Sequence, residues 1–111
     1  MDIDSQQVGA VAVLKPKGPV AGAEADDLKT QLLAAVAGNL GRVVVDASNM
    51  PFVDSRGLEV FVEVSDELAQ GGRVLKMCSI SETLREVMYA TDLLSMFEHY
   101  EDVHSAVRSF L

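Results

Sequence analysis

The chain has 111 residues, of which 49 % are hydrophobic and 23 % charged, a composition typical of a folded globular protein and not of a disordered segment. Its 9 Lys and Arg residues stand against 17 Asp and Glu residues. The resulting net charge of −8 argues against binding to nucleic acid or to an anionic membrane surface, because both require a basic face. Domains most often have about 100–150 residues, so we expect one domain over residues 1–111.

The cysteine content and the N-terminal residues indicate the cellular compartment. The single cysteine, Cys78, excludes an internal disulfide and a zinc site built from several cysteines. It lies in an apolar run, and we interpret it as a buried, unreactive thiol. The chain begins without the basic and apolar segments of a signal peptide, and no apolar run approaches the roughly 20 residues that span a bilayer. We therefore expect a cytoplasmic protein.

Two strands, a helix and a third strand are predicted in the first part of the chain. Alanine and valine alternate within residues 8–14, which favours a strand that follows a weak first strand near Ile3. Apolar residues recur at three- or four-residue spacing over 23–37 and predict an amphipathic helix, which the glycines after it end. The run 42–46 is β-branched and apolar on both faces, as in a strand that helices cover from both sides.

A second helix and another buried strand follow. The helix is predicted over 55–70 and ends at the Gly71-Gly72 pair, and the strand is predicted over 73–78. The side chains predicted to point inward from this helix are Leu58, Phe61, Val64 and Leu68.

The last part of the chain predicts a helix, a strand and a helix. Ser79 and Glu82 have the Ser-x-x-Glu spacing of a capping box, which predicts a helix that opens here and runs through Met88. A short strand is predicted within 94–100, and Asp102 leads a final amphipathic helix. This alternation of strands and helices predicts an α/β fold with a largely parallel sheet.

The most informative segment is 43–58, which combines a buried strand, a seven-residue loop and a helix that opens with Asp54 and Ser55. A helix N-terminus presents unpaired N–H groups and the positive end of the helix dipole. Asp54 or Ser55 can cap these groups, and this structural role alone explains both residues. The same geometry also suits a phosphate carried on a hydroxyl.

This segment resembles the STAS domain family, and within it the small bacterial anti-sigma-factor antagonists. The family has a hydrophobic strand ending in Asp, then an aromatic and an aliphatic residue, then Asp-Ser-Ser/Thr-Gly-Leu at a helix opening. The matching residues here are Val43–Asp46, Phe52-Val53 and Asp54–Leu58. Further similarities extend over essentially the whole chain, at Gly18-Pro19-Val20, Gly71–Leu75, Ser79–Leu84 and Thr91–Leu94.

The resemblance implies a STAS-like α/β fold, with a mixed sheet of four or five strands and about four helices packed mainly on one side. It implies a non-catalytic protein-interaction module of the anti-sigma-factor antagonist type, in a bacterial partner-switching pathway. Such a module binds an anti-sigma factor or a serine-kinase-like protein, without a cofactor. We expect it to be a monomer or a weak dimer. The alternative is a STAS accessory subunit on the cytoplasmic side of a transporter complex.

Two departures from the family pattern concern phosphate handling. The family accepts a phosphate on the third residue of its motif, where this chain has Arg56, and the family's early-turn Asp is replaced by Ala21. Two mechanisms remain open. In the first, Arg56 holds a fixed positive charge, and the protein binds its partner without phosphoregulation. In the second, Ser55 is the phosphorylation site and Arg56 pairs with the new phosphate.

The resemblance and the exposed loop together predict a partner-binding surface around the helix opening. Asp54 and Ser55 order the opening, and Gly57 lets a partner approach the backbone. The residues predicted for this surface are Val20, Ala21, Phe52, Asp54, Ser55, Arg56, Gly57 and Glu59. Acidic residues of the same helix form either a solvated face or a surface that steers a basic partner; these are Glu59, Glu63, Asp66 and Glu67.

No catalytic residue and no metal ligand is predicted. The sequence contains no nucleophile elbow, no glycine-rich phosphate loop and no cysteine pair. His99 and His104 stand near acidic residues, but their spacing fixes no metal geometry.

Overall fold

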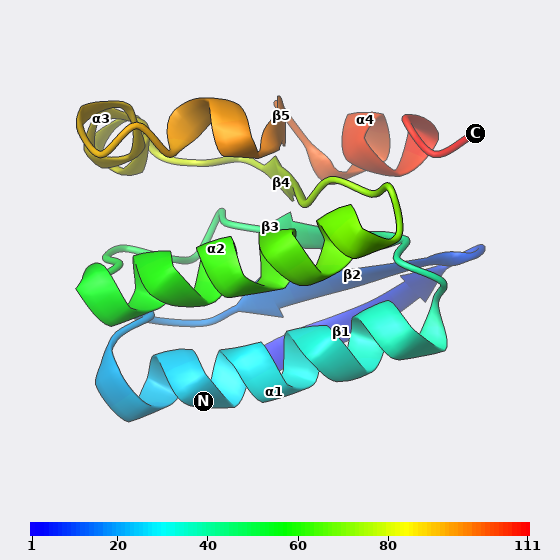
Figure 1. The fold of residues 1–111 in the computed structure, drawn as a ribbon, viewed down its shortest axis with the longest axis horizontal. Coiled ribbons are helices and arrows are strands. Elements are labelled where there is room, and N and C mark those ends of the chain that lie inside the picture. The colour runs from blue at the N-terminus through cyan, green and yellow to red at the C-terminus, as the bar shows by residue number, and fades with distance from the viewer.

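The computed structural model describes residues 1–111 and contains one five-stranded sheet with the strand order β1-β2-β3-β4-β5. β1 pairs with β2 in antiparallel orientation, and the other neighbours are parallel, so the sheet is mixed as predicted (Figure 1). The strands are β1 (Ile3–Val8), β2 (Val11–Pro16), β3 (Val43–Asp46), β4 (Lys76–Cys78) and β5 (Glu98–Tyr100). The helices are α1 (Gly22–Gly38), α2 (Ser55–Gln70), α3 (Glu82–Ala90) and α4 (Val103–Arg108), and the 3-10 turn η1 (Leu94–Met96) precedes β5.

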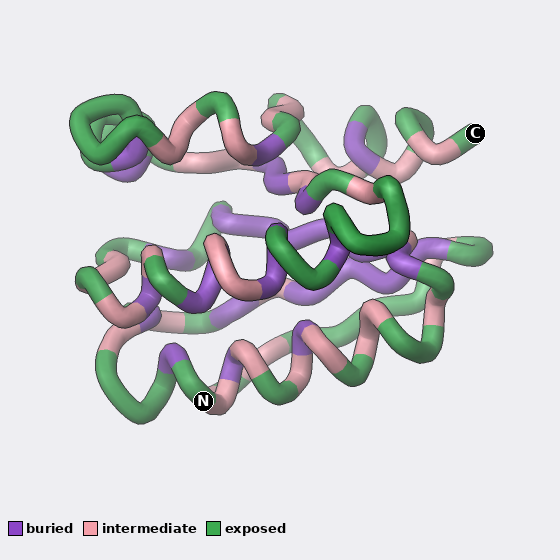
Figure 2. Tube along the Cα trace, viewed as in Figure 1, coloured by how far each residue is buried: buried purple, intermediate pink, exposed green.

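The helices pack mainly on one face of the sheet, as predicted. The larger core cluster joins this face to buried residues of α1, α2 and α3, among them Leu28, Phe61 and Met88. The smaller cluster lies on the opposite face, where Ala106 of α4 packs near Val44. The parallel strands are therefore buried between helices on both sides, and the purple core in Figure 2 follows the central strands. No helix is long and apolar enough to cross a membrane.

The N-terminal strand prediction is wrong in its boundaries. Residues 8–14 are not one strand, because the chain turns back at Gly9 and Ala10, and Val8 pairs with Val11 across the turn. Gly9 has φ +60°, a left-handed conformation that glycine adopts without steric cost. The alternation of apolar residues therefore continues across a tight hairpin between β1 and β2.

The helix prediction over 55–70 is confirmed, with one addition to its buried face. Phe61, Val64 and Leu68 are buried as predicted, while Leu58 is only half-buried and packs at the edge of the core. Val60, which was not predicted to point inward, is fully buried. The buried face of α2 is thus wider than the four residues predicted to point inward would make it.

The predicted capping box at Ser79 is wrong. Ser81 caps α3 by accepting a hydrogen bond from the Leu84 N–H, and α3 begins at Glu82. Ser79 instead has φ +58°, and its hydroxyl donates to the Glu101 carbonyl at 3.0 Å. That contact ties the exit of β4 to the exit of β5 and delays the helix start.

The other late elements agree with the prediction, with shorter strands. Asp102 caps α4 by accepting a hydrogen bond from the Ser105 N–H at 2.8 Å. The strand predicted over 73–78 shortens to β4, and the strand within 94–100 follows η1 as β5.

The beginnings of α1 and α2 are held together at the end of the molecule where the parallel strands finish (Figure 1). Val20 and Val53 form an isolated parallel bridge there. The Val20 N–H donates to the Phe52 carbonyl at 2.9 Å, and the Asp54 N–H donates to the Val20 carbonyl at 3.2 Å. These bonds place the segment before α1 directly beside the loop before α2.

Candidate functional site

Asp54 connects the openings of both helices. Its Oδ1 accepts a hydrogen bond from the Gly57 N–H at 2.8 Å, so it is the N-cap of α2. Its Oδ2 accepts a second hydrogen bond from the Gly22 N–H at 3.1 Å. Gly22 is the first residue of α1, and the residue at the N-cap of that helix, Ala21, provides no side-chain hydrogen bond. One carboxylate therefore satisfies orphan N–H groups of two helices.

Ser55 does not take part in capping. It is the first residue of α2 and is exposed, so the cap is Asp54 alone. A cap residue must precede the helix with extended backbone geometry, and Asp54 has this geometry.

Two residues predicted for the partner surface are buried. The Val20 side chain has 0 % of its surface exposed, and Gly57 is also buried. A Cβ atom on Gly57 would lie 2.5 Å from the Val20 carbonyl oxygen and 2.6 Å from Cγ1 of Val53. The prediction that Gly57 admits a partner is wrong, because the backbone that approaches it belongs to the same chain.

Arg56 is surrounded by carboxylates. Its Nε lies 3.0 Å from Asp26 Oδ1 on α1, and its Nη2 contacts the same oxygen. Its Nη1 lies 3.0 Å from Glu63 Oε1 and 3.2 Å from Glu59 Oε2. Hydrogen bonds to Asp26 and then to Glu63 raise the pKa of the guanidinium.

A second cation completes this cluster between α1 and α2. Lys29 Nζ lies 2.7 Å from Glu63 Oε2. The contacts with Lys29 and then with Arg56 lower the pKa of Glu63. Asp26, Lys29, Arg56, Glu59 and Glu63 are called the charge cluster below.

The charge cluster bears on the first of the two mechanisms. That mechanism places a fixed positive charge at the helix opening, and in the structure this charge is paired with Asp26, Glu59 and Glu63 of the same chain. The cluster holds three carboxylates and two cations, and the Asp54 carboxylate caps the same helix. The helix opening is therefore acidic.

Phe52 is an exposed apolar residue at this end of the molecule, with 56 % of its surface exposed. It borders a groove of about 260 Å³ between the loop before α2 and helix α3. The residues lining the groove are Met50, Pro51, Phe52, Val53, Thr83, Leu84 and Val87. Phe52 and Val87 stand exposed at the groove, so apolar contact area adjoins the acidic helix opening.

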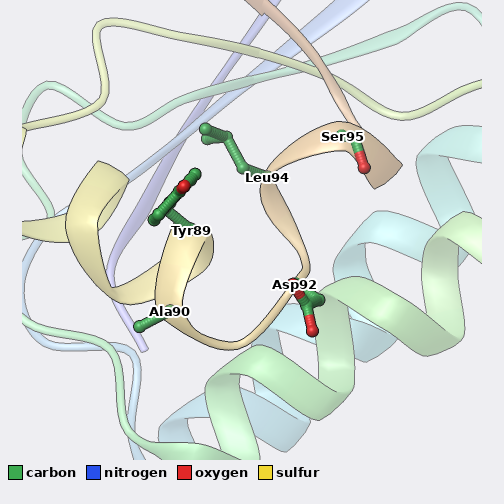
Figure 3. Close-up of a pocket in the computed structure, with 5 residues that line it drawn as sticks. All are labelled: Tyr89, Ala90, Asp92, Leu94 and Ser95. Atoms are coloured by element: carbon green, nitrogen blue, oxygen red, sulfur yellow. The ribbon is translucent and has the colours of Figure 1, made fainter.

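A depression beyond α3 was not predicted from the sequence. Tyr89 is 75 % exposed, and it lines an open hollow with Ala90, Asp92, Leu94 and Ser95. Figure 3 shows the Tyr89 and Leu94 side chains close to each other, while Asp92 projects from the turn that follows α3. Tyr89 directly follows the buried Met88, and the sequence pattern carries no signal that it faces solvent.

Cys78 and His99 are not part of the site at the openings of α1 and α2. Cys78 is fully buried, and burial raises the pKa of its thiol to about 11, which agrees with an unreactive side chain. The Nε2 of His99 donates to the Leu94 carbonyl at 2.7 Å, and its ring packs edge-on against Phe97.

Comparisons with known proteins agree with this fold. The STAS domain model matches residues 2–106. BtrV of Bordetella bronchiseptica, a candidate anti-sigma factor antagonist, is 27 % identical over 110 residues, which cover 99 % of this chain and 95 % of that protein.

Solved structures share the fold at low sequence identity. The crystal structure of a candidate anti-sigma factor antagonist from Thermotoga maritima superposes with a TM-score of 0.88 at 18 % identity, covering 96 % of this chain and 92 % of that one. The Bacillus cell fate determinant SpoIIAA, solved in its phosphorylated form, superposes with a TM-score of 0.74 at 15 % identity, covering 99 % and 100 %. With the family model matching nearly the whole chain, this protein belongs to the STAS domain family.

Proposed function

We propose that this protein is an anti-sigma-factor antagonist, a non-catalytic module that binds an anti-sigma factor of the serine-kinase type in a bacterial partner-switching pathway. The observation that carries the proposal is the match to the STAS family over residues 2–106, with the family's helix opening exposed at one end of the molecule. The relative BtrV, which matches over the whole chain, is named for the same activity. The transporter-subunit alternative has less support, because that relative is not a transporter component by name.

We further propose that binding is not regulated by phosphorylation at the position usual in the family. The third residue of the family motif is Arg56, whose side chain has no hydroxyl to accept a phosphate. Its guanidinium is occupied by Asp26, Glu59 and Glu63, so it is not a vacant counter-charge for a phosphate on Ser55. The two carboxylates of α2 in this cluster, together with Asp54, would also repel a phosphate at Ser55.

The exposed members of the predicted surface support docking at the helix openings. Phe52 provides apolar area in the loop before α2, and Ser55 and Glu59 provide exposed polar groups in the first two turns of α2. Interfaces of this kind place an aromatic anchor within a polar rim. We therefore expect the partner to contact the loop before α2 and the first two turns of that helix.

The test is a calorimetric titration of the protein with a purified kinase-type anti-sigma factor from the same organism. We expect a one-to-one complex, and we expect Phe52→Ser to weaken it by about tenfold or more, as for the loss of an anchoring aromatic residue. Leu40→Ser is the matched control, since Leu40 is exposed but follows the far end of α1. Absence of binding by the unaltered protein would overturn the proposed function.

A further inference from the structure

A second groove lies between α2 and the turn that follows α3. It has a volume of about 400 Å³ and is open to solvent along one side. The residues lining it are Ser55, Leu58, Glu59, Val62, Glu63, Thr91 and Leu93. It begins at Ser55, so it is continuous with the helix opening, but it runs along a different side of α2 from the Phe52 groove.

The floor of this groove is apolar and partly unpartnered. Leu58 and Leu93 are half-buried and pack against the core. Val62 lies one helical turn beyond Leu58 and is also half-buried, but it does not pack against the core. A valine that faces a groove without supporting the core is free to contact a second molecule.

The rim of the groove is acidic. Glu59 has a side chain 64 % exposed, and its single ion pair uses only Oε2, so Oε1 is open to another donor. Asp92 lies between the lining residues Thr91 and Leu93 in the sequence but lines the neighbouring hollow beside Tyr89; it is exposed and has no ion pair. Asp66 lies one turn beyond Val62 and is likewise exposed without an ion pair. No Lys, Arg or His lines the groove, although Arg56 and Lys29 pair from outside it with the lining carboxylates Glu59 and Glu63.

This chemistry selects one kind of occupant. A second copy of this chain carries a net charge of −8 and would bring repulsion to an acidic rim, and a nucleic acid would do the same. A helix with an aliphatic stripe bordered by Lys and Arg matches both the floor and the rim. We propose that this groove binds a basic amphipathic helix of the protein partner, an inference that rests on the proposed function for the partner being a protein.

The first test uses synthetic helical peptides of about 15 residues, which form about four turns. One peptide carries Leu at i and i+4 with Lys beside them, a second replaces Lys with Glu, and a third replaces Leu with Ser. In NMR titrations of the isotope-labelled protein, we expect only the Leu/Lys peptide to shift the amides of Leu58, Val62 and Leu93. If the Ser/Lys peptide gave equal shifts, charge attraction alone would explain the binding. That result would overturn the proposal.

Matched variants locate the binding on the protein. Val62→Arg fills the groove and reverses its charge, so we expect peptide affinity to fall by about tenfold or more. Val74→Arg is the control, because Val74 is similarly half-exposed but lies before β4 and outside the groove. Glu59→Lys should weaken binding, while Glu67→Lys, an exposed change on the same helix outside the groove, should not. Equal affinities within either pair would overturn the proposal.

The same variants separate this proposal from the proposed function when titrated with the kinase-type anti-sigma factor. If that protein binds the unaltered chain and Val62→Arg equally well, the groove proposal is wrong and the proposed function stands. If the anti-sigma factor binds neither the unaltered chain nor Val62→Arg, the proposed function is wrong. If the Leu/Lys peptide still binds in the groove in that case, the assignment of the groove to a basic amphipathic helix stands.

Discussion

Arg56 at the opening of α2 and Asp26 in α1 are joined by a hydrogen bond of 3.0 Å, although they stand 30 positions apart in the sequence. The guanidinium, at the position where the family resemblance leads us to expect a phosphate acceptor, is thus used to connect two helices. Glu59 and Glu63 hold it from the α2 side. Because the arginine is neutralised within the chain, the acidic character of the helix opening is permanent and does not depend on modification at this position.

Restoring a hydroxyl at this position tests whether only the phosphate acceptor has been lost. We expect Arg56→Ser to be phosphorylated by the kinase-type anti-sigma factor with ATP, and to leave the complex once modified, because the added charge of about −1.5 to −2 opposes docking at an acidic surface. Intact-mass measurement checks the modification. Arg56→Lys, which removes the guanidinium without adding a hydroxyl, should remain unmodified. An unmodified Arg56→Ser protein would show that more than the acceptor differs.

Removal of the shared cap is expected to destabilise the protein. Asp54→Ala leaves the N–H groups of Gly57 and Gly22 without their side-chain acceptor. Loss of an N-cap costs about 1 kcal/mol of unfolding free energy, within a range of about 0.5–2 kcal/mol. Because Asp54 also accepts a hydrogen bond from Gly22 at the start of α1, we expect the loss for Asp54→Ala to lie at the upper end of this range. Urea denaturation measures the free energy of unfolding. Asp66→Ala, which removes an exposed carboxylate without an ion pair, should stay within about 0.5 kcal/mol of the unaltered protein.

The close packing of Gly57 predicts a large effect from one methyl group. In Gly57→Ala the new Cβ would meet the Val20 carbonyl 2.5 Å away, and the two helix openings would have to separate. Overpacking of this kind costs about 1–3 kcal/mol. Gly38→Ala is the control, since no atom lies within 4 Å of its added Cβ and the residue is helical. We expect that control to be neutral or slightly stabilising in thermal unfolding; an equal loss in both variants would contradict the packing argument.

The charge cluster predicts a loss of stability in acid. Lys29 and Arg56 lower the pKa of Glu63 in the folded protein, so the folded state binds fewer protons than the unfolded state near the ordinary Glu value of about 4.3. The stabilisation is therefore complete above that pH and is lost as the pH falls through the lowered pKa of the folded state. Urea midpoints measured from neutral to acidic pH should show a smaller fall for Glu63→Gln than for the unaltered protein. The same profile for both would refute this assignment, and Glu67→Gln should keep the original profile.

Local sequence signals predicted most of the fold but not all of the boundaries. The helix over 55–70 is found because its apolar spacing is strong and Asp54 precedes it with a cap. The Ser79 capping box fails because a contact distant in sequence, to Glu101, holds Ser79 in the left-handed region and moves the cap to Ser81. The spacing of residues within one segment carries no information about a contact with a residue distant in the sequence.

The start of α2 was predicted in position, but the contacts made there were not. The Asp54-Ser55-Arg56-Gly57 motif identified the helix opening, yet the burial of Gly57 and Val20 follows from the bridge between Val20 and Val53. The role of Asp26 depends on α1 lying beside α2, a relationship that neither helix encodes alone. A lone arginine in the sequence therefore looks available to a partner, although the folded chain uses it internally.

We propose that this protein binds a kinase-type anti-sigma factor without being switched off by phosphorylation. The most direct measurement incubates the unaltered protein with that partner and ATP, and follows both the complex by size-exclusion chromatography and the modification by intact mass. We expect the complex to persist and the protein to carry no phosphate. A phosphate on Ser55 accompanied by release of the partner would contradict this proposal.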